Sequence, residues 1–301
     1  MVATKSYYPK STSPQQEVTR VLWQVLLANV LVALAKIAAG LAAGSISLVA
    51  DGFHSATDAS SNIIGLVGTH LAARSPDKDH PYGHAKFETF ATLGIGLLLL
   101  LTSWDILKSV FARLFDGTAP QVSALSYAVI GVTILINLGV TVYERRKGQQ
   151  LNSAILLADA AHTRSDIFVS VSVLGSLVAV QAGWPWLDAL VALAIVGAIA
   201  HTGWGIVRQA SNILADSVAV DKKKVEEVVT AVAGIKSCHK IRSRGSNQVS
   251  YLDLHIQVDN QMSIEEAHRL GHVAQNRLQE ALGITDVIVH VEPAINAEPR
   301  R

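Results

Sequence analysis

The stretch DGFHSATD (Asp51–Asp58) and the stretch DAAHTRSD (Asp159–Asp166) repeat one pattern, D-x-x-H-x-x-x-D. Both copies lie inside long apolar runs, where a charged side chain costs about 2.5–3.5 kcal/mol on membrane-insertion scales. In a helix, residues at i, i+3 and i+7 share one face, so each copy predicts a stripe of two carboxylates and one imidazole. Such a repeated stripe persists only if something compensates its charge.

The composition around the two copies predicts a membrane part and a water-soluble part. Of the 301 residues, 16% are charged, against about 25% in a typical soluble domain. The deficit lies within the apolar region, so we predict a polar tail over 1–20, a membrane domain over 21–208 and a soluble domain over 209–301. The net charge of +1 gives no sign of nucleic-acid binding. The single cysteine, Cys238, fits a reducing compartment for its region.

Six stretches approach the roughly 20 apolar residues that a membrane-spanning helix needs. They are 21–43, 46–73, 88–113, 121–143, 151–180 and 186–208. Basic residues gather after the second stretch, at Lys78 and Lys86, and after the fourth, at Arg145 and Arg146, whereas the loops after the first and fifth have none. The positive-inside rule then puts both termini in the cytoplasm of a multi-pass protein of the cell (inner) membrane.

The soluble part is predicted to be a small α+β domain with the order αββαβ. Its predicted elements are a helix over Lys222–Ala233, strands over Ser237–Arg244 and Tyr251–Asp259, a helix over Ser263–Leu282 and a strand over Asp286–Val291. A domain of this size has a marginal core, which a homodimer would support.

The repeated motif has three physical explanations: hydrogen bonds that only hold the helices together, a proton relay without metal, or a divalent metal site. Polar packing residues in membranes are usually Ser, Thr, Gly or Asn rather than ionised acids, which disfavours the first. If the two stripes meet, they supply two nitrogens and two oxygens in a tetrahedral set suited to zinc, and a 2+ ion balances two carboxylates. The four residues of this predicted transport site are His54, Asp58, His162 and Asp166.

Asp51 and Asp159 stand one turn before each histidine. They either orient the imidazoles as hydrogen-bond acceptors or guide the ion at the mouth of the site, and the sequence leaves both roles open. A membrane metalloenzyme would need a group that activates water beside the metal. Because the chain has neither H-E-x-x-H nor an evident separate general base, we do not expect an enzyme.

Taken together, these features resemble the cation diffusion facilitators, a family of proton-coupled exporters of divalent metals. The resemblance covers roughly residues 15–295 and includes H-x-x-x-D in spans two and five and the loop DKDHPYGHAKFE after span two. It implies a six-helix transmembrane bundle with a ferredoxin-like cytoplasmic domain, and the two-His, two-Asp site resembles that of zinc-preferring members. Iron, cobalt, cadmium or manganese stay open as the exported ion, as does a non-transporting metal sensor or scaffold of the same fold.

The resemblance also implies further metal positions, a homodimer in the lipid bilayer and exchange of metal for protons. A second site is expected in the loop, whose spacing of i, i+3 and i+7 favours a compact ligand set, at Asp77, His80 and His84. Regulatory zinc is expected in the cytoplasmic domain at His239, His255, His268, His290 and Glu292, the last of which is an aspartate in the family pattern. An ion pair between Lys86 and Asp216 is expected to lock the helices to the domain.

Overall fold

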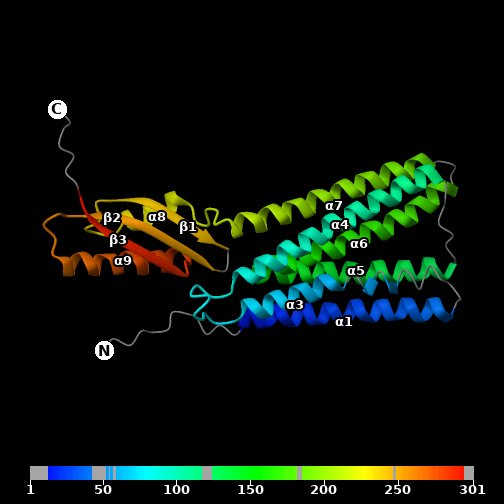
Figure 1. Ribbon diagram of the computed structural model, residues 1–301, viewed down its shortest axis with the longest axis horizontal. Coiled ribbons are helices and arrows are strands. Elements are labelled where there is room, and N and C mark those ends of the chain that lie inside the picture. The colour runs from blue at the N-terminus through cyan, green and yellow to red at the C-terminus, as the bar shows by residue number, and fades with distance from the viewer. Residues whose placement is uncertain are drawn as a thin grey trace. The chain divides into compact units, whose positions relative to one another are not determined.

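The computed structural model describes residues 13–42, 52–53, 55–56, 59–116, 124–181, 185–246 and 249–294. The chain divides into two compact units, Met1–Ala210 and Ser211–Arg301. The first unit is built from the helices seen in Figure 1: α1 (Ser13–Ala42), α3 (Ser60–Ala72), α4 (Lys86–Asp116), α5 (Ala124–Gln150), α6 (Ala154–Gln181) and α7 (Pro185–Leu214), which continues into the second unit.

The helices of the first unit pack side by side along much of their length (Figure 1). Helix α6 contacts α3, α4 and α5, and α1 contacts α3 and α5. Small residues allow the closest approach, since a Cβ atom at Gly68 of α3 would clash with the Cβ of Ala91 on α4. Close contact through small residues is how helices associate in lipid, where apolar surface alone provides no driving force.

This unit exposes many large apolar side chains and buries many polar ones beside an apolar core. Large apolar side chains face outward, among them Trp23, Leu31 and Leu34 on α1 and Leu101 and Trp104 on α4. The buried positions include many polar side chains: Lys36, Asn62, Thr69, Thr92, Ser103, Thr133, Glu144, Ser153, Asp159, His162, Thr163 and Ser165. Such extensive exposed apolar surface around a polar interior is typical of helices surrounded by lipid.

Two of the described helices satisfy the length and hydropathy expected of a membrane span. They are α1 over Gln15–Ala39 and α4 over Lys86–Lys108. Helix α6, which packs against α3, α4 and α5, carries three charged residues in its first half, Asp159, Arg164 and Asp166. Six crossings of the membrane therefore stay a prediction.

The second unit has the αββαβ order that the sequence predicted. Its elements are α8 (Lys222–Thr230), β1 (Ser237–Gly245), β2 (Ser250–Val258), α9 (Ile264–Leu282) and β3 (Asp286–Pro293). The sheet order is β1-β2-β3, with β1 antiparallel and β3 parallel to the central strand. The Asp221 side chain caps α8, and Ser263 and Glu266 form a capping box at the start of α9.

The core of the second unit explains which side chains of the sheet remain accessible. Leu252, Leu254 and Ile256 of β2 are buried in one cluster with residues of α8 and α9. Because successive side chains of a strand point to opposite faces, Asp253 and His255 lie on the other face, where they are only half-buried. The sheet thus holds a row of polar groups on the face opposite its core.

Candidate metal centres

Of the two copies of the repeated motif, the structure describes the second, Asp159–Asp166, in full. Asp51, His54 and Asp58 lie outside the described residues. On α6, His162 is only 4% exposed, and neither of its ring nitrogens has a hydrogen-bond partner within the part of the chain that the structure describes. Asp166 follows one turn later on the same helix and is half-buried. A buried imidazole without a partner is costly, and it fits a position where a ligand completes the contacts.

Asp159, the acid one turn before His162, is fully buried and forms a hydrogen bond with another helix. Its Oδ2 accepts a hydrogen bond from Nδ2 of Asn62 on α3. Since His162 has no described hydrogen-bond partner, Asp159 does not orient that imidazole among the described residues. The carboxyl of Glu144 on α5 interacts directly with the carboxyl of Asp159.

Sequence reasoning missed Glu144. It precedes Arg145, Arg146 and Lys147, a charged run that is typical of a solvated loop. The structure extends α5 to Gln150 and packs it along α6, so the Glu144 side chain is fully buried. The residues next to Glu144 give no indication that its side chain is buried. Its burial results from the packing of α5 against α6.

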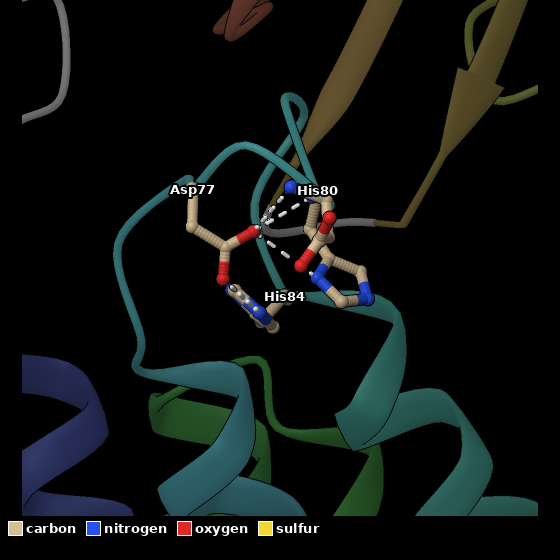
Figure 2. A network of polar contacts seen from close by, with 4 residues as sticks. Asp77, His80 and His84 are labelled. Carbon is tan, nitrogen blue, oxygen red and sulfur yellow. Dashed lines mark hydrogen bonds and ion pairs between the residues drawn. The ribbon is translucent and has the colours of Figure 1, made fainter.

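The loop between α3 and α4 brings its three predicted ligands together (Figure 2). One oxygen of Asp77 lies 3.2 Å from Nδ1 of His80, and the other lies 3.3 Å from Nε2 of His84. Ligand atoms of all three residues lie within 4.8 Å of one another. His84 is buried, and its Nδ1 has no partner within the described part of the chain. This loop cluster of two nitrogens and one carboxylate suits a borderline ion such as Zn²⁺.

Backbone geometry holds the loop cluster in place. Oδ1 of Asp77 accepts hydrogen bonds from the backbone N–H groups of Asp79, at 3.0 Å, and His80, at 2.7 Å. The His80 backbone N–H is the main reason that the pKa of Asp77 is lower than the usual carboxyl value. Gly83 has a φ of 83°, a left-handed conformation that returns the chain to α4 and suits glycine. The ionised carboxylate is therefore fixed before any metal arrives.

The second unit assembles a tail cluster from three strands. His239 of β1 lies opposite His255 of β2, which lies opposite His290 of β3. The Glu292 carboxylate sits between imidazoles, 3.1 Å from Nε2 of His239 and 2.6 Å from Nδ1 of His255. His239, His255 and Glu292 could hold a metal ion, and Nε2 of His290 lies 3.7 Å from the same carboxylate. The hydrogen bond from His255 is the main cause that lowers the pKa of Glu292.

The remaining predicted residues lie apart from these clusters in a single chain. His268 of α9 faces His272, with 3.2 Å between their Nε2 atoms, on the exposed side of the helix. Asp216 forms an ion pair with Arg244 at 3.8 Å within the second unit. Lys86 begins α4 in the first unit, so the predicted lock between Lys86 and Asp216 would join the two units and stays a prediction.

A helical unit with an apolar surface, buried polar groups and a histidine–carboxylate loop cluster, followed by a small α+β unit with a second such cluster, is typical of a membrane protein that handles metal cations. Two family models match this arrangement: the cation efflux transmembrane domain over residues 22–215 and the cation efflux protein cytoplasmic domain over residues 219–294. The chain belongs to this family, the cation diffusion facilitators, whose members are cation efflux transporters rather than enzymes and whose cytoplasmic domain forms dimers.

Curated relatives cover almost the whole chain. An uncharacterized transporter of Methanocaldococcus jannaschii is 32% identical over 92% of this chain and 99% of its own length. The manganese efflux system protein MneS of Bacillus subtilis is 29% identical over 82% of this chain and 86% of its own. The cation-efflux pump FieF of Shewanella oneidensis is 27% identical over 88% of this chain and 90% of its own. The chain is thus similar to metal efflux proteins along its full architecture.

Proposed function

We propose that the protein exports zinc from the cytoplasm in exchange for protons. The observation that carries the proposal is the His162 imidazole, which is buried on α6 with both ring nitrogens unpaired among the described residues. Together with Asp166 it offers one nitrogen and one oxygen from this half of the repeated motif. His54 and Asp58 would supply the other half, giving two nitrogens and two oxygens, the set that zinc accepts in a tetrahedral site.

Proton exchange follows from the chemistry of this ligand set. Metal binds imidazole and carboxylate only in their deprotonated forms, so protons and metal compete for the same four groups. Imidazole titrates in the physiological range, so a higher proton concentration outside would displace the ion there. The metal would leave outward while protons travel inward, with both termini of the chain in the cytoplasm.

A second candidate is manganese export, which the name of the Bacillus subtilis relative favours. Manganese prefers oxygen ligands, whereas zinc accepts imidazole readily. The described half of the site contains a histidine, which supports zinc. Iron, cobalt and cadmium can bind the same nitrogen and oxygen ligands, so the ligand set does not single out any one of them. The identity of the ion therefore depends on whether His162 takes part in binding.

The loop cluster and the tail cluster would bind additional ions with separate roles. Asp77, His80 and His84 offer a site at the end of α3, and His239, His255, His290 and Glu292 offer a regulatory site on the sheet. His268, exposed on α9, would complete the latter from the second subunit of a homodimer. Zinc on the tail cluster would then report a rising cytosolic concentration to the transporter, and the ion pair of Lys86 with Asp216 would connect the two units.

The test is metal flux into proteoliposomes that contain one purified preparation, with zinc, manganese, iron, cobalt and cadmium supplied in turn under an imposed pH gradient. We expect zinc flux that rises with the proton gradient and falls to the background of empty vesicles in His162→Ala. His201→Ala, which removes an exposed histidine of α7, is the matched control and should transport like the unmodified protein.

Two results would overturn the proposal. Zinc flux in His162→Ala equal to that of the unmodified protein would remove His162 from the site. Manganese flux that exceeds zinc flux in the unmodified protein would favour the second candidate. His162→Asp sharpens the choice, because an oxygen in place of nitrogen should shift preference from zinc toward manganese.

A further inference from the structure

The interior of the helical unit contains a polar network that the metal ligands do not explain. It joins four helices: Asn29 of α1, Asn62 of α3, Glu144 of α5, and Asp159 and Thr163 of α6. Nδ2 of Asn29 donates to Oδ1 of Asn62 at 2.8 Å, and Nδ2 of Asn62 donates to Oδ2 of Asp159. The Thr163 hydroxyl lies 3.5 Å from Oε2 of Glu144. Two carboxyl groups thus end the network side by side.

One oxygen of each carboxyl group has no hydrogen-bond partner among the described residues. Oε1 of Glu144 and Oδ1 of Asp159 are both buried and have no hydrogen-bond partner within the described residues. Both side chains are 0% exposed, so water does not provide the missing contacts at the surface. Since buried polar oxygen atoms almost always have partners, the two unpaired atoms point to a cation or proton bound by these two carboxyl groups.

The negative charge of Glu144 and Asp159 also indicates a bound cation or proton. Neither carboxylate has an ion pair with a basic side chain that the structure describes. Among the side chains that the structure describes, the acids, bases and histidines on the helices packed around the pair are Glu17, Arg20 and Lys36 of α1, His70 of α3, Lys86, Glu88, Asp105 and Lys108 of α4, Arg145, Arg146 and Lys147 of α5, and His162, Arg164 and Asp166 of α6. Two adjacent buried carboxylates do not both stay ionised without compensation.

A proton fits this place better than a metal ion. Only two oxygen atoms are free, and Glu144 and Asp159 do not belong to the groups of three ligands found in the described residues. A shared proton needs just two oxygens, one to carry it and one to accept it. We propose that Glu144 and Asp159 form a proton-binding dyad that holds one proton when the neighbouring metal site is empty and releases it when that site fills.

Position along α6 links the dyad to the transport site. Asp159 precedes His162 by three residues, which places the two side chains on one face of the helix, with roughly 5–6 Å between Cβ atoms. A divalent ion at His162 would favour the ionised form of both acids, since an opposite charge nearby stabilises a carboxylate. The proton bound at the dyad would leave as the metal arrives and return as the metal departs. This coupling rests on the proposed metal–proton exchange.

Infrared difference spectroscopy on the purified full-length protein at neutral pH tests the dyad directly. A protonated carboxyl group has a carbonyl stretch that shifts in D₂O, and zinc should abolish this band in the unmodified protein. Glu144→Gln and Asp159→Asn keep the shapes of the side chains, and each should lose the zinc-sensitive band. Asp105→Asn, in an exposed ion pair with Lys108, is the matched control and should keep it. In His162→Ala the band should be present but insensitive to zinc at the transport site.

Absence of the band from the metal-free protein would overturn the proposal. So would its persistence in both Glu144→Gln and Asp159→Asn. The spectroscopic result is independent of transport: zinc flux that ignores the proton gradient would refute the exchange proposed above, while the band alone decides whether the dyad holds a proton.

Discussion

The loop cluster and the tail cluster contain the same kinds of ligand but are built in opposite ways. Asp77, His80 and His84 lie within eight consecutive residues, and turns of the backbone bring them together. His239, His255 and Glu292 come from three strands, and the register of the sheet brings them together. The first cluster depends on its own loop, whereas the second depends on a hydrophobic core on the other face of its sheet. This difference predicts distinct responses to mutation.

Acidification should affect both clusters in the same way and give the largest change. The lowered pKa values of Asp77 and Glu292 mean that both carboxylates stay ionised as the pH falls through the range in which imidazoles titrate. The stabilising effect of each ionised carboxylate is present above the usual carboxyl pKa and is lost only as the pH falls through the lower pKa of the folded state. Metal loss between about pH 8 and pH 5 therefore reflects imidazole protonation.

Protons compete with zinc for each imidazole, so the affinity should fall by up to about 10-fold per pH unit for each histidine that binds the ion, or about 100-fold for the two histidines of the loop cluster. Equilibrium dialysis against zinc checks this in His239→Ala, which retains the loop cluster, and in His80→Ala, which retains the tail cluster. A zinc affinity that stays constant down to about pH 5 would exclude histidine as a ligand in that cluster.

A cavity in the core of the second unit should weaken the tail cluster and leave the loop cluster unchanged. Leu254 is 1% exposed and neighbours His255 on β2, with its side chain on the opposite face of the sheet. Leu254→Ala should destabilise the second unit by about 2–5 kcal/mol, because it removes a buried side chain and leaves a cavity. Hydrogen exchange of the strand amides measures this change, and zinc binding at the loop cluster should be unaffected.

The control for the cavity is Val273→Ala, an exposed position of α9 where we expect a change within about 0.5 kcal/mol. Strand amides that exchange equally slowly in Leu254→Ala and in the unmodified protein would show that this core does not support the tail cluster. Loss of zinc from the loop cluster in the same variant would contradict its independence.

The smallest change in zinc affinity should come from replacing the carboxylate of each cluster. This replacement also shows that Asp77 holds the backbone of its loop, whereas Glu292 does not hold the backbone of its sheet. Asp77→Ala and Glu292→Ala should each weaken zinc binding at their own cluster by at least roughly 10–100-fold, the range found when a residue that only orients a ligand is lost. Asp77→Ala should also speed amide exchange at Asp79 and His80, whose N–H groups lose their acceptor. Glu292→Ala should leave amide exchange of the strands unchanged.

Asp77→Asn provides the matched comparison, since its amide oxygen still accepts the two backbone hydrogen bonds while its charge is gone. We expect slow exchange at both amides together with weak zinc binding. Asp79→Ala removes a neighbouring acid outside the cluster and should change neither. Rapid exchange in Asp77→Asn would show that charge, rather than hydrogen bonding, holds the loop.

Much of this architecture could be predicted from local patterns. Strand alternation and the capping residue Ser263 predicted the αββαβ order, and the spacing of Asp77, His80 and His84 predicted a compact group. Helix α8 ends at Thr230, three residues before its predicted end. The tail ligands were expected only from resemblance to a family, because residues on separate strands have no spacing that reveals their contact.

The sequence by itself determined that charged and imidazole groups recur inside apolar helices, since hydropathy and helical periodicity are properties of neighbouring residues. Tertiary structure alone decided which of those groups are buried together. Glu144 follows the pattern of a solvated acid beside arginines, but the packing of α5 on α6 removes it from water and places it against Asp159. Burial arises from contacts between distant segments, and a carboxyl group changes its chemistry when those contacts exclude water and oppose it to a second acid.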